Sequence, residues 1–347
     1  GRIPHNFFRY ATNVDASSAE PAGLVALGEA LFFDPVLSGN QDIACATCHV
    51  EDLGTSDFVS LAIGTGGYGT GPNRVIGLGR RLGARNTLDL YNRGYPEFGA
   101  LGWDGAVEWT AEGVDVPVEW VEDRDVFPEG VATPLEGFIL AELADRRKML
   151  GLRGDERADG ELNELGGLDE VDRGEIWAPL AARVSDKPDY QALIAVAFPD
   201  RTGEPITVVE IARALAAYVS DAYRVTDTPF DRWLAGDPGA LAPEERRGLE
   251  IFVGEGDCLT CHAGAHLSDF DYHNLAVPQV GLGQPDEEPL DYGRGRETED
   301  PRDRYSFRTP ALRNVALTGP WMHDGAYTRL EAAVRHHLDC VDGLESY

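Results

Sequence analysis

Basic residues are scarce in this chain of 347 residues, and so are long apolar runs. Lys and Arg number 30 against 60 Asp and Glu, which gives a formal net charge of −30. This excess of negative charge argues against a nucleic acid or an anionic lipid surface as partner, because both would be repelled. The sequence contains no run of about 18 apolar residues, so it predicts no transmembrane helix.

Cysteine is also sparse, with five residues in all, and four of them fall in two short strings. The strings are residues 45–49 (CATCH) and residues 258–262 (CLTCH). Each is a C-x-x-C-H, the attachment motif of a c-type haem, in which both cysteines form thioethers and the histidine becomes an axial iron ligand. Paired cysteines also build zinc sites, but those need no histidine directly after each pair. The fifth cysteine, Cys340, is left without an assigned role.

The sequence around the first string has few residues that could serve as a second axial ligand of its haem iron. No histidine lies between His49 and His262, and the only methionine in that interval is Met149. An iron with an open axial position can bind peroxide, whereas an iron with two protein ligands transfers electrons. We therefore expect the haem on His49 to be open and reactive, with His5 as the alternative that would close it.

Hydrophobic spacing predicts a mainly α protein with few strands. Helical patterns cover residues 22–33, 134–150, 206–222, 241–252 and 330–338, and long irregular segments cover 64–83, 104–132, 153–175 and 281–304. We expect two tandem cytochrome c-like haem domains, residues 1–175 and 176–347, with the chain near 1–20 packing on either. Because c-type haem is attached outside the bacterial cytoplasm, we expect a periplasmic protein whose signal peptide precedes Gly1.

Five segments resemble the bacterial di-haem cytochrome c peroxidase and MauG family. They are residues 31–39 (LFFDPVLSG), 85–87 (RNT), 103–105 (WDG), 229–232 (PFDR) and 307–325 (FRTPALRNVALTGPWMHDG). The resemblance covers nearly the whole chain in the order that the family has, and the last segment is the most specific. It implies an oxidoreductase with two covalently bound c-type haems.

The resemblance also implies the second ligand of the C-terminal haem. In this family the ligand lies fourteen residues after the histidine of the last segment, and it is methionine in the peroxidases and tyrosine in MauG. Counting from His323 gives His337, so the resemblance implies a His262/His337 pair. That pair is similar to the MbnH-type branch, which oxidises tryptophan in a partner protein. The adjacent His336 points about 100° away on a helix, so only one of the two can reach the iron.

Two further residues take catalytic roles by resemblance. Trp103 matches the tryptophan that the family places between its haems, where it relays electrons; the alternative is a buried core tryptophan with a hydrogen-bonded N–H. Glu136 resembles the glutamate that moves protons while peroxide is cleaved. Glu136 also completes a capping box with Thr133, which is a competing explanation. Glu119, Glu122 and Glu129 are weaker candidates for the same role.

A calcium ion lies between the haems in this family. The matching positions are the side chain of Asn86 and the backbone carbonyls of Thr318 and Pro320, and hard oxygen ligands of this kind suit Ca²⁺. Asn86 could instead be a turn residue. For His266 and His273 we expect structural or propionate contacts rather than iron ligation.

Together these features predict a periplasmic di-haem oxidoreductase that is activated by hydrogen peroxide. It would form a high-valent di-haem state and oxidise an aromatic residue, tryptophan, of a partner protein. The alternative is a cytochrome c peroxidase that reduces hydrogen peroxide with electrons from a small cytochrome c. A third possibility, a plain electron-transfer protein, requires two axial ligands on both irons.

Overall fold

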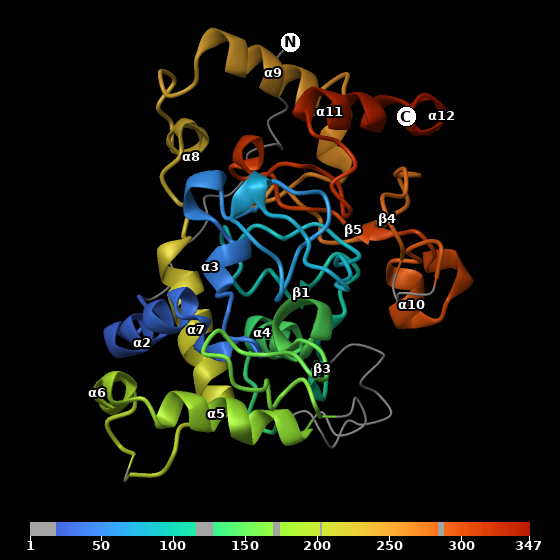
Figure 1. Ribbon diagram of the computed structural model, residues 1–347. Helices are drawn as coiled ribbons and strands as arrows, with labels where there is room; N and C mark the ends of the chain where they lie inside the picture. The colour runs from blue at the N-terminus through green and yellow to red at the C-terminus, as the bar shows by residue number, and fades with distance from the viewer. Residues whose placement is uncertain (1–18, 116–127, 169–173, 202, 284–287) are drawn as a thin grey trace.

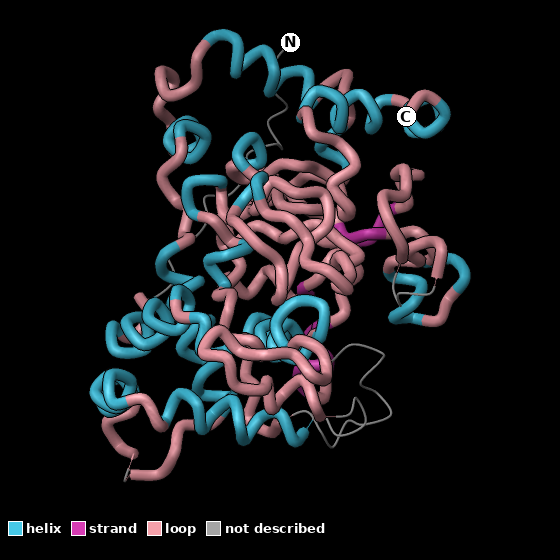
Figure 2. Tube along the Cα trace, viewed as in Figure 1, coloured by secondary structure: helices cyan, strands magenta, loops and turns pink. Residues whose placement is uncertain are grey.

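The computed structural model describes residues 19–115, 128–168, 174–201, 203–283 and 288–347. The chain is mainly helical with little sheet, and Figure 2 shows helices around the outside with loops filling the middle. His5, Glu119 and Glu122, which the sequence raised as candidates, lie outside the described residues. No helix of the described part has both the length and the apolar character needed to cross a bilayer.

The longer helices are α2 (Ala22–Phe33), α4 (Pro134–Ala144), α5 (Trp177–Ser185), α6 (Pro188–Ala197), α7 (Val208–Ala222), α9 (Pro243–Val253) and α11 (Leu330–Leu338). The shorter ones are α3 (Cys45–Cys48), α8 (Pro229–Leu234), α10 (Arg294–Thr298) and α12 (Cys340–Glu345). Figure 1 shows α9 and α11 at one end of the molecule and α2, α5 and α6 at the other.

Two small sheets complete the described elements. Strands β1 (Ala100–Leu101), β2 (Val107–Thr110) and β3 (Gly113–Asp115) form an antiparallel sheet in the order β1-β2-β3. Strands β4 (Tyr272–His273) and β5 (Phe307–Arg308) pair with each other. We predicted a loop over 104–132, and that is wrong for β2 and β3, whose hairpin forms because Val107 is fully buried under α4.

The main core forms where α2, α4 and α5 pack around α7, and α6 packs on α2 and α5. Helix α7 begins at a capping box in which Thr207 and Glu210 exchange hydrogen bonds, and its buried face carries Ile211 and Leu215. The core runs from Leu27 to Tyr223. It therefore extends past the boundary that we predicted after residue 175, because α5, α6 and α7 pack on the N-terminal helices.

The crossing of α2 and α7 depends on Gly28. A Cβ atom at this position would lie 1.9 Å from the backbone oxygen of Ala214 and 2.7 Å from the Cβ of Tyr218. Contacts this short are impossible without a shift of one helix. The absent side chain thus sets the distance between the two helices that form one wall of the core.

We expect Gly28→Ala to lower the free energy of unfolding by about 1–3 kcal/mol, the usual cost of overpacking a core. Chemical denaturation measures the change. The matched control is Gly248→Ala on α9, where a new Cβ would have nothing within 4 Å. That substitution should stabilise the protein by about 0.5–1 kcal/mol, because alanine is the better helix former. Equal effects of the two substitutions would contradict the close packing of α2 on α7.

Candidate functional site

The first cysteine string lies in the wall of a large cavity. Cys45 and Cys48 begin and end helix α3, and His49 follows directly. The cavity measures about 660 Å³ and is lined by both cysteines, His49, Trp103 and many apolar side chains. Both cysteines are free, and burial raises the pKa of each thiol to about 12. Among the described residues, Cys45, Cys48 and His49 belong to no cluster of three possible metal-ligand side chains, and a large, mainly apolar cavity lies beside them. The site therefore fits haem attachment better than a zinc site, which needs four converging protein ligands.

His49 is held in the form that binds a metal. Its Nδ1 lies 3.1 Å from the backbone oxygen of Thr55. Because a carbonyl oxygen only accepts hydrogen bonds, Nδ1 carries the proton and Nε2 keeps its lone pair. Burial lowers the pKa of His49 to about 4, so the ring is neutral at physiological pH.

Helix α4 and the residue after it contribute two of the acidic groups of this cavity, whose wall also includes Asp89, Asp104 and Glu297. Glu142 and Asp145 both line it, together with Lys148, which forms an ion pair with Glu142. Burial raises the pKa of Glu142, and the charge of Lys148 opposes the rise. Glu142 is therefore a carboxyl group that can exchange a proton inside the cavity. Met149 also contributes to the wall.

Glu136, the predicted proton carrier, lies elsewhere on the same helix. It is buried, and its carboxylate accepts a hydrogen bond of 2.7 Å from the backbone N–H of Ala132 and lies 3.5 Å from the Nε of Arg213. It is not among the residues that line the cavity. Its contacts are those of a helix cap, which was the competing explanation. Glu129, a weaker candidate, is exposed.

A sequence signal for Glu142 exists. Leu135, Phe138, Ile139 and Glu142 all line the cavity, and they follow the i, i+3, i+4, i+7 spacing of one helical face. Glu136 is about 100° away from Leu135 around the helix, so it faces another direction. The apolar face of α4 is thus the sequence signal that could have predicted an acid in the cavity wall at Glu142.

Trp103 connects the first cavity to the C-terminal half of the chain. Its indole N–H donates a hydrogen bond of 3.0 Å to the backbone oxygen of Asn86, and its ring lines the cavity. Its backbone oxygen accepts a hydrogen bond of 2.7 Å from Arg308 on β5. One hydrogen bond therefore orients the indole ring, and the other holds the backbone of Trp103 against the C-terminal half of the chain.

Two buried guanidinium groups beside the first cavity fit an anionic ligand. Arg93 and Arg308 flank the ring of Phe98, at 4.9 and 5.9 Å from its centroid. One Nη1 atom of each is buried and has no hydrogen-bond partner among the described residues. Burial and the nearby charge of Arg93 lower the pKa of Arg308 to about 10. Arg93 lines the cavity, and because haem carries two carboxylates, its unpartnered donor and the apolar wall fit a haem.

The second cysteine string has a histidine facing it. Cys258 and Cys261 lie at a short helical turn, and the ring centroids of His262 and His337 are 6.3 Å apart. The Nδ1 of His262 donates to the backbone oxygen of Leu267 at 3.0 Å, and the Nδ1 of His337 donates to that of Ala333 at 2.8 Å. Both rings thus keep Nε2 free. The separation accommodates two metal–nitrogen bonds of about 2.0–2.1 Å with a metal between the rings.

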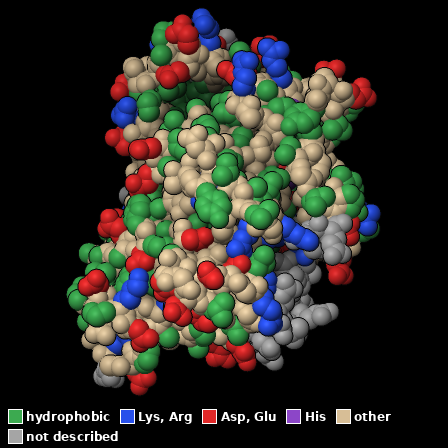
Figure 3. All heavy atoms as spheres, viewed as in Figure 1, with side chains coloured by type: hydrophobic (Ala, Val, Ile, Leu, Met, Phe, Trp, Pro, Cys, Tyr) green, Lys and Arg blue, Asp and Glu red, His purple; other side chains and the backbone are tan. Residues whose placement is uncertain are grey.

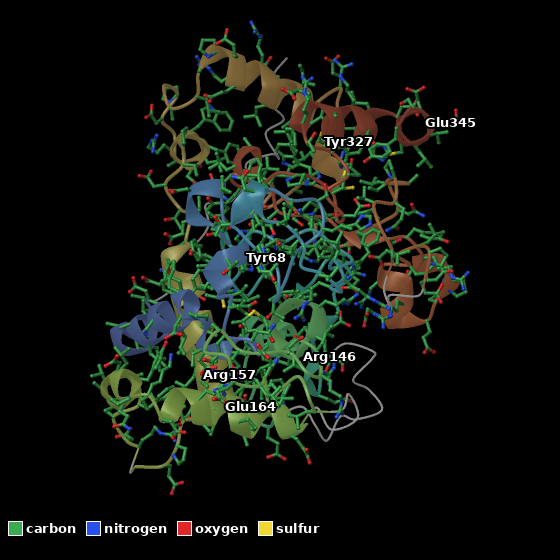
Figure 4. The ribbon with its side chains drawn as sticks, viewed as in Figure 1. Tyr68, Arg146, Arg157, Glu164, Tyr327 and Glu345 are labelled. Atoms are coloured by element: carbon green, nitrogen blue, oxygen red, sulfur yellow. The ribbon has the colours of Figure 1, made fainter. Side chains whose placement is uncertain are left out.

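His336 has a different environment. It is buried, with Nδ1 3.0 Å from the hydroxyl of Tyr327 and Nε2 2.7 Å from the backbone oxygen of Leu275. Figure 4 shows Tyr327 close to α11, the helix that carries both histidines. Because both ring nitrogens of His336 are engaged, the structure leaves His337 as the residue that can complete the second site.

The segments that carry the predicted calcium ligands are linked by hydrogen bonds. The side-chain amide of Asn86 donates to the backbone oxygen of Val59 at 2.9 Å, and its backbone N–H donates to that of His323 at 2.7 Å. The hydroxyl of Ser56 donates to the backbone oxygen of Gly319, which lies between Thr318 and Pro320. Asn86 and this turn are therefore held by the same short segment, and the calcium site stays a prediction.

His266 and His273 have structural contacts. His266 is buried against the rings of Phe98 and Phe270, at 5.0 and 6.0 Å. The Nε2 of His273 lies 3.0 Å from the carboxylate of Asp269. Neither histidine faces His49 or His262 in a ring contact among the described residues.

Comparisons with known proteins show the family of the chain. The family model for di-haem cytochrome c peroxidase matches residues 22–239. MauG of Methylorubrum extorquens is 30% identical over 335 residues, covering 95% of this chain and 73% of that protein. Cytochrome c551 peroxidase of Pseudomonas aeruginosa is 30% identical over 312 residues, covering 89% of this chain and 69% of that protein.

Solved structures show the same fold. A MauG-like protein associated with microbial copper homeostasis has a TM-score of 0.64 and 26% identity, over 94% of this chain and 79% of that one. The di-haem peroxidase BthA of Burkholderia thailandensis has a TM-score of 0.60 and 22% identity, over 94% of this chain and 74% of that one. This second likeness shows the fold alone.

Proposed function

The chain belongs to the di-haem cytochrome c peroxidase family, and from this membership we propose that it is a periplasmic enzyme, activated by hydrogen peroxide, that oxidises a tryptophan of a partner protein. As a member of the family it is a di-haem peroxidase-type oxidoreductase. The observation that carries the proposal is that the two sites differ in their second axial ligand. His262 faces His337 at 6.3 Å, whereas among the described residues no histidine faces His49 in this way.

The two haems, each bound covalently through one C-x-x-C-H string, would bind and reduce peroxide at the first site and hold oxidising equivalents at the second. This chain's residues supply the proton chemistry. The Glu142 carboxylate would take a proton from one oxygen of bound hydrogen peroxide and give it to the other oxygen, which leaves as water. Its raised pKa suits both transfers, and Lys148 keeps the carboxylate oriented within the cavity.

Trp103 would carry electrons between the two sites. Its indole N–H is fixed on Asn86, so the ring keeps one orientation beside the first cavity. We assign a structural calcium ion to Asn86, Thr318 and Pro320, where it would hold the segments on both sides of this tryptophan. In this proposal the two haem sites form tandem haem domains, the first built on α2, α4 and α7 and the second on α9 and α11.

A cytochrome c peroxidase is the second candidate. The relatives include enzymes of both kinds at the same identity of 30%. The position fourteen residues after His323 distinguishes them, because the resemblance implies methionine there in the peroxidases and this chain has His337. Histidine in place of methionine lowers the haem potential. That difference favours oxidation of a partner protein over uptake of electrons from a small cytochrome c.

We expect the oxidised holoprotein to give one high-spin and one low-spin haem signal in its EPR spectrum. Hydrogen peroxide added without a reductant should then produce a near-infrared absorbance band, because the oxidising equivalents are shared between the sites. Two low-spin signals would contradict the proposal and would indicate a further ligand, such as Met149 or His5. Rapid turnover with reduced cytochrome c, without the band, would favour the second candidate.

A further inference from the structure

A pair of buried tyrosines lies next to the first cavity, behind Phe32 in its wall. Tyr218 on α7 and Tyr223 just after it are 5% and 6% exposed, and their ring centroids are 5.9 Å apart. Phe32 of α2 lines the cavity, and its centroid is 5.1 Å from Tyr218 and 5.9 Å from Tyr223. The same ring is 6.4 Å from His49. One aromatic ring therefore separates both phenols from the site that would react with peroxide.

Both phenols share one carboxylate. The hydroxyls of Tyr218 and Tyr223 lie 3.4 and 3.2 Å from Oε1 of Glu51. Glu51 itself is exposed, so its carboxylate is in contact with water. A phenol that loses an electron must also lose its proton, and it does so readily only when an acceptor is already hydrogen-bonded to its hydroxyl. Glu51 provides that acceptor for either tyrosine.

The protonation of the pair supports the same chemistry. Burial, the neighbouring phenol and the charge of Glu51 raise the pKa of Tyr223, and burial raises that of Tyr218. Both phenols are therefore neutral at physiological pH, and removal of an electron has to be coupled to transfer of the proton. An electron can pass through Phe32 without any change in the fold, because the rings are already in contact.

We propose that Tyr218 and Tyr223 are oxidised by the first site when no partner protein is present, and that they form a second outlet for its oxidising equivalents. One electron leaves each phenol, the O–H bond breaks, the proton passes through Glu51 to water, and a neutral tyrosyl radical remains. Two phenols supply the two electrons and two protons that convert one hydrogen peroxide to two waters. A small phenol or ascorbate in solution restores the tyrosines. The inference rests on the proposed function, which supplies the oxidant.

The chain offers a matched control in Tyr190. This tyrosine is 4% exposed, and its hydroxyl lies 3.1 Å from the carboxylate of Asp34. It thus has the same burial and the same kind of acceptor as Tyr223, and it packs against the same helix, α2. Tyr218 and Tyr223 contact Phe32, which lines the cavity, whereas Tyr190 has no ring contact with Phe32 among the described residues. A purely structural role for a buried phenol–carboxylate contact predicts the same behaviour for both, whereas an outlet predicts different behaviour.

The test treats the holoprotein with one equivalent of hydrogen peroxide, without partner or reductant, and records the EPR spectrum of rapidly frozen samples. We expect a tyrosyl radical signal in the native protein and in Tyr190→Phe. The signal should be lost in the double variant Tyr218→Phe/Tyr223→Phe, and the peroxide-oxidised state should then persist longer. Glu51→Gln keeps both phenols and should weaken the signal, which keeps the test valid if the double variant does not fold.

A signal that survives in the double variant, or that disappears equally in Tyr190→Phe, would overturn the inference. So would haem spectra that change with peroxide while no tyrosyl signal forms, and in that case the proposed function would stand. Absence of any spectral change on adding peroxide would refute both.

Discussion

Replacing His337 with alanine should abolish the low-spin signal of the second haem and leave the spectrum of the first haem unchanged. The ring centroids of His262 and His337 are 6.3 Å apart, and Nδ1 of each donates to a backbone oxygen, so Nε2 is the nitrogen of each ring that is left to bind a metal. Loss of one ring leaves a single protein ligand, and the iron changes spin state or takes up water. Absorbance and EPR spectra of the oxidised holoprotein measure the change.

His336→Ala is the control for this variant, since it removes the neighbouring histidine. His336 bridges Tyr327 and the backbone oxygen of Leu275, so its loss should lower the thermal stability without altering either haem spectrum. Breaking buried hydrogen bonds of this kind costs about 1–3 kcal/mol. If His336→Ala changed the low-spin signal and His337→Ala did not, the assignment of the second ligand would be reversed.

Replacing Glu142 with glutamine should slow the reaction with hydrogen peroxide by about 10²–10⁴-fold, the usual contribution of a positioned proton carrier. The amide keeps the size of the side chain but cannot take up or release the proton. Lys148 keeps a second carboxylate, Asp145, at 3.8 Å, so its position should change little. Stopped-flow absorbance after mixing with peroxide measures the rate.

Glu136→Gln on the same helix is the matched control. Glutamine can still accept the hydrogen bond from the N–H of Ala132, so the cap and the fold should be kept. Because Glu136 does not line the cavity, the rate should stay at that of the native protein. A large loss of rate in Glu136→Gln, with little in Glu142→Gln, would restore Glu136 as the proton carrier.

The sequence predicted the fold best where caps and periodicity agree. The helices expected over 22–33 and 330–338 are confirmed as Ala22–Phe33 and Leu330–Leu338. The helix expected to reach residue 150 ends instead at Ala144, because Asp145 accepts hydrogen bonds from the N–H groups of two following residues and starts a wider helical turn. Helix α5 was not predicted, since Ile176 before it offers no side-chain cap.

The residues of the candidate site also differ in how far the sequence alone could predict them. The spacing of the two cysteine strings predicts both haem sites, because attachment depends on neighbours in sequence. The resemblance already implied His337, and the tertiary structure adds the physical reason, because it brings Tyr327 and Leu275 against the ring of His336. The proposal of Glu142 in place of Glu136 also depends on the structure, which places Glu142 and not Glu136 in the cavity wall.

Charge shows a similar limit of sequence reasoning. The net charge of −30 predicts an acidic surface, and Figure 3 shows acidic side chains spread over the viewed face rather than gathered in one patch. The cavity of the first site, in contrast, is lined by several arginines and a lysine, including Arg85, Arg93 and Lys148. An average over the whole chain therefore gives no information about the charge that a haem or peroxide would meet.

The hydrogen bonds that orient the histidines have a consequence for mutation. His49, His262 and His337 each donate Nδ1 to a backbone oxygen, those of Thr55, Leu267 and Ala333. No exchange of side chain at those three positions deletes the acceptor, since every amino acid carries the same carbonyl group. Side-chain substitutions at these three positions therefore leave the hydrogen bonds that orient the histidines in place. Substitutions at Thr55, Leu267 and Ala333 should therefore leave the three ring orientations unchanged, as long as the backbone keeps its path.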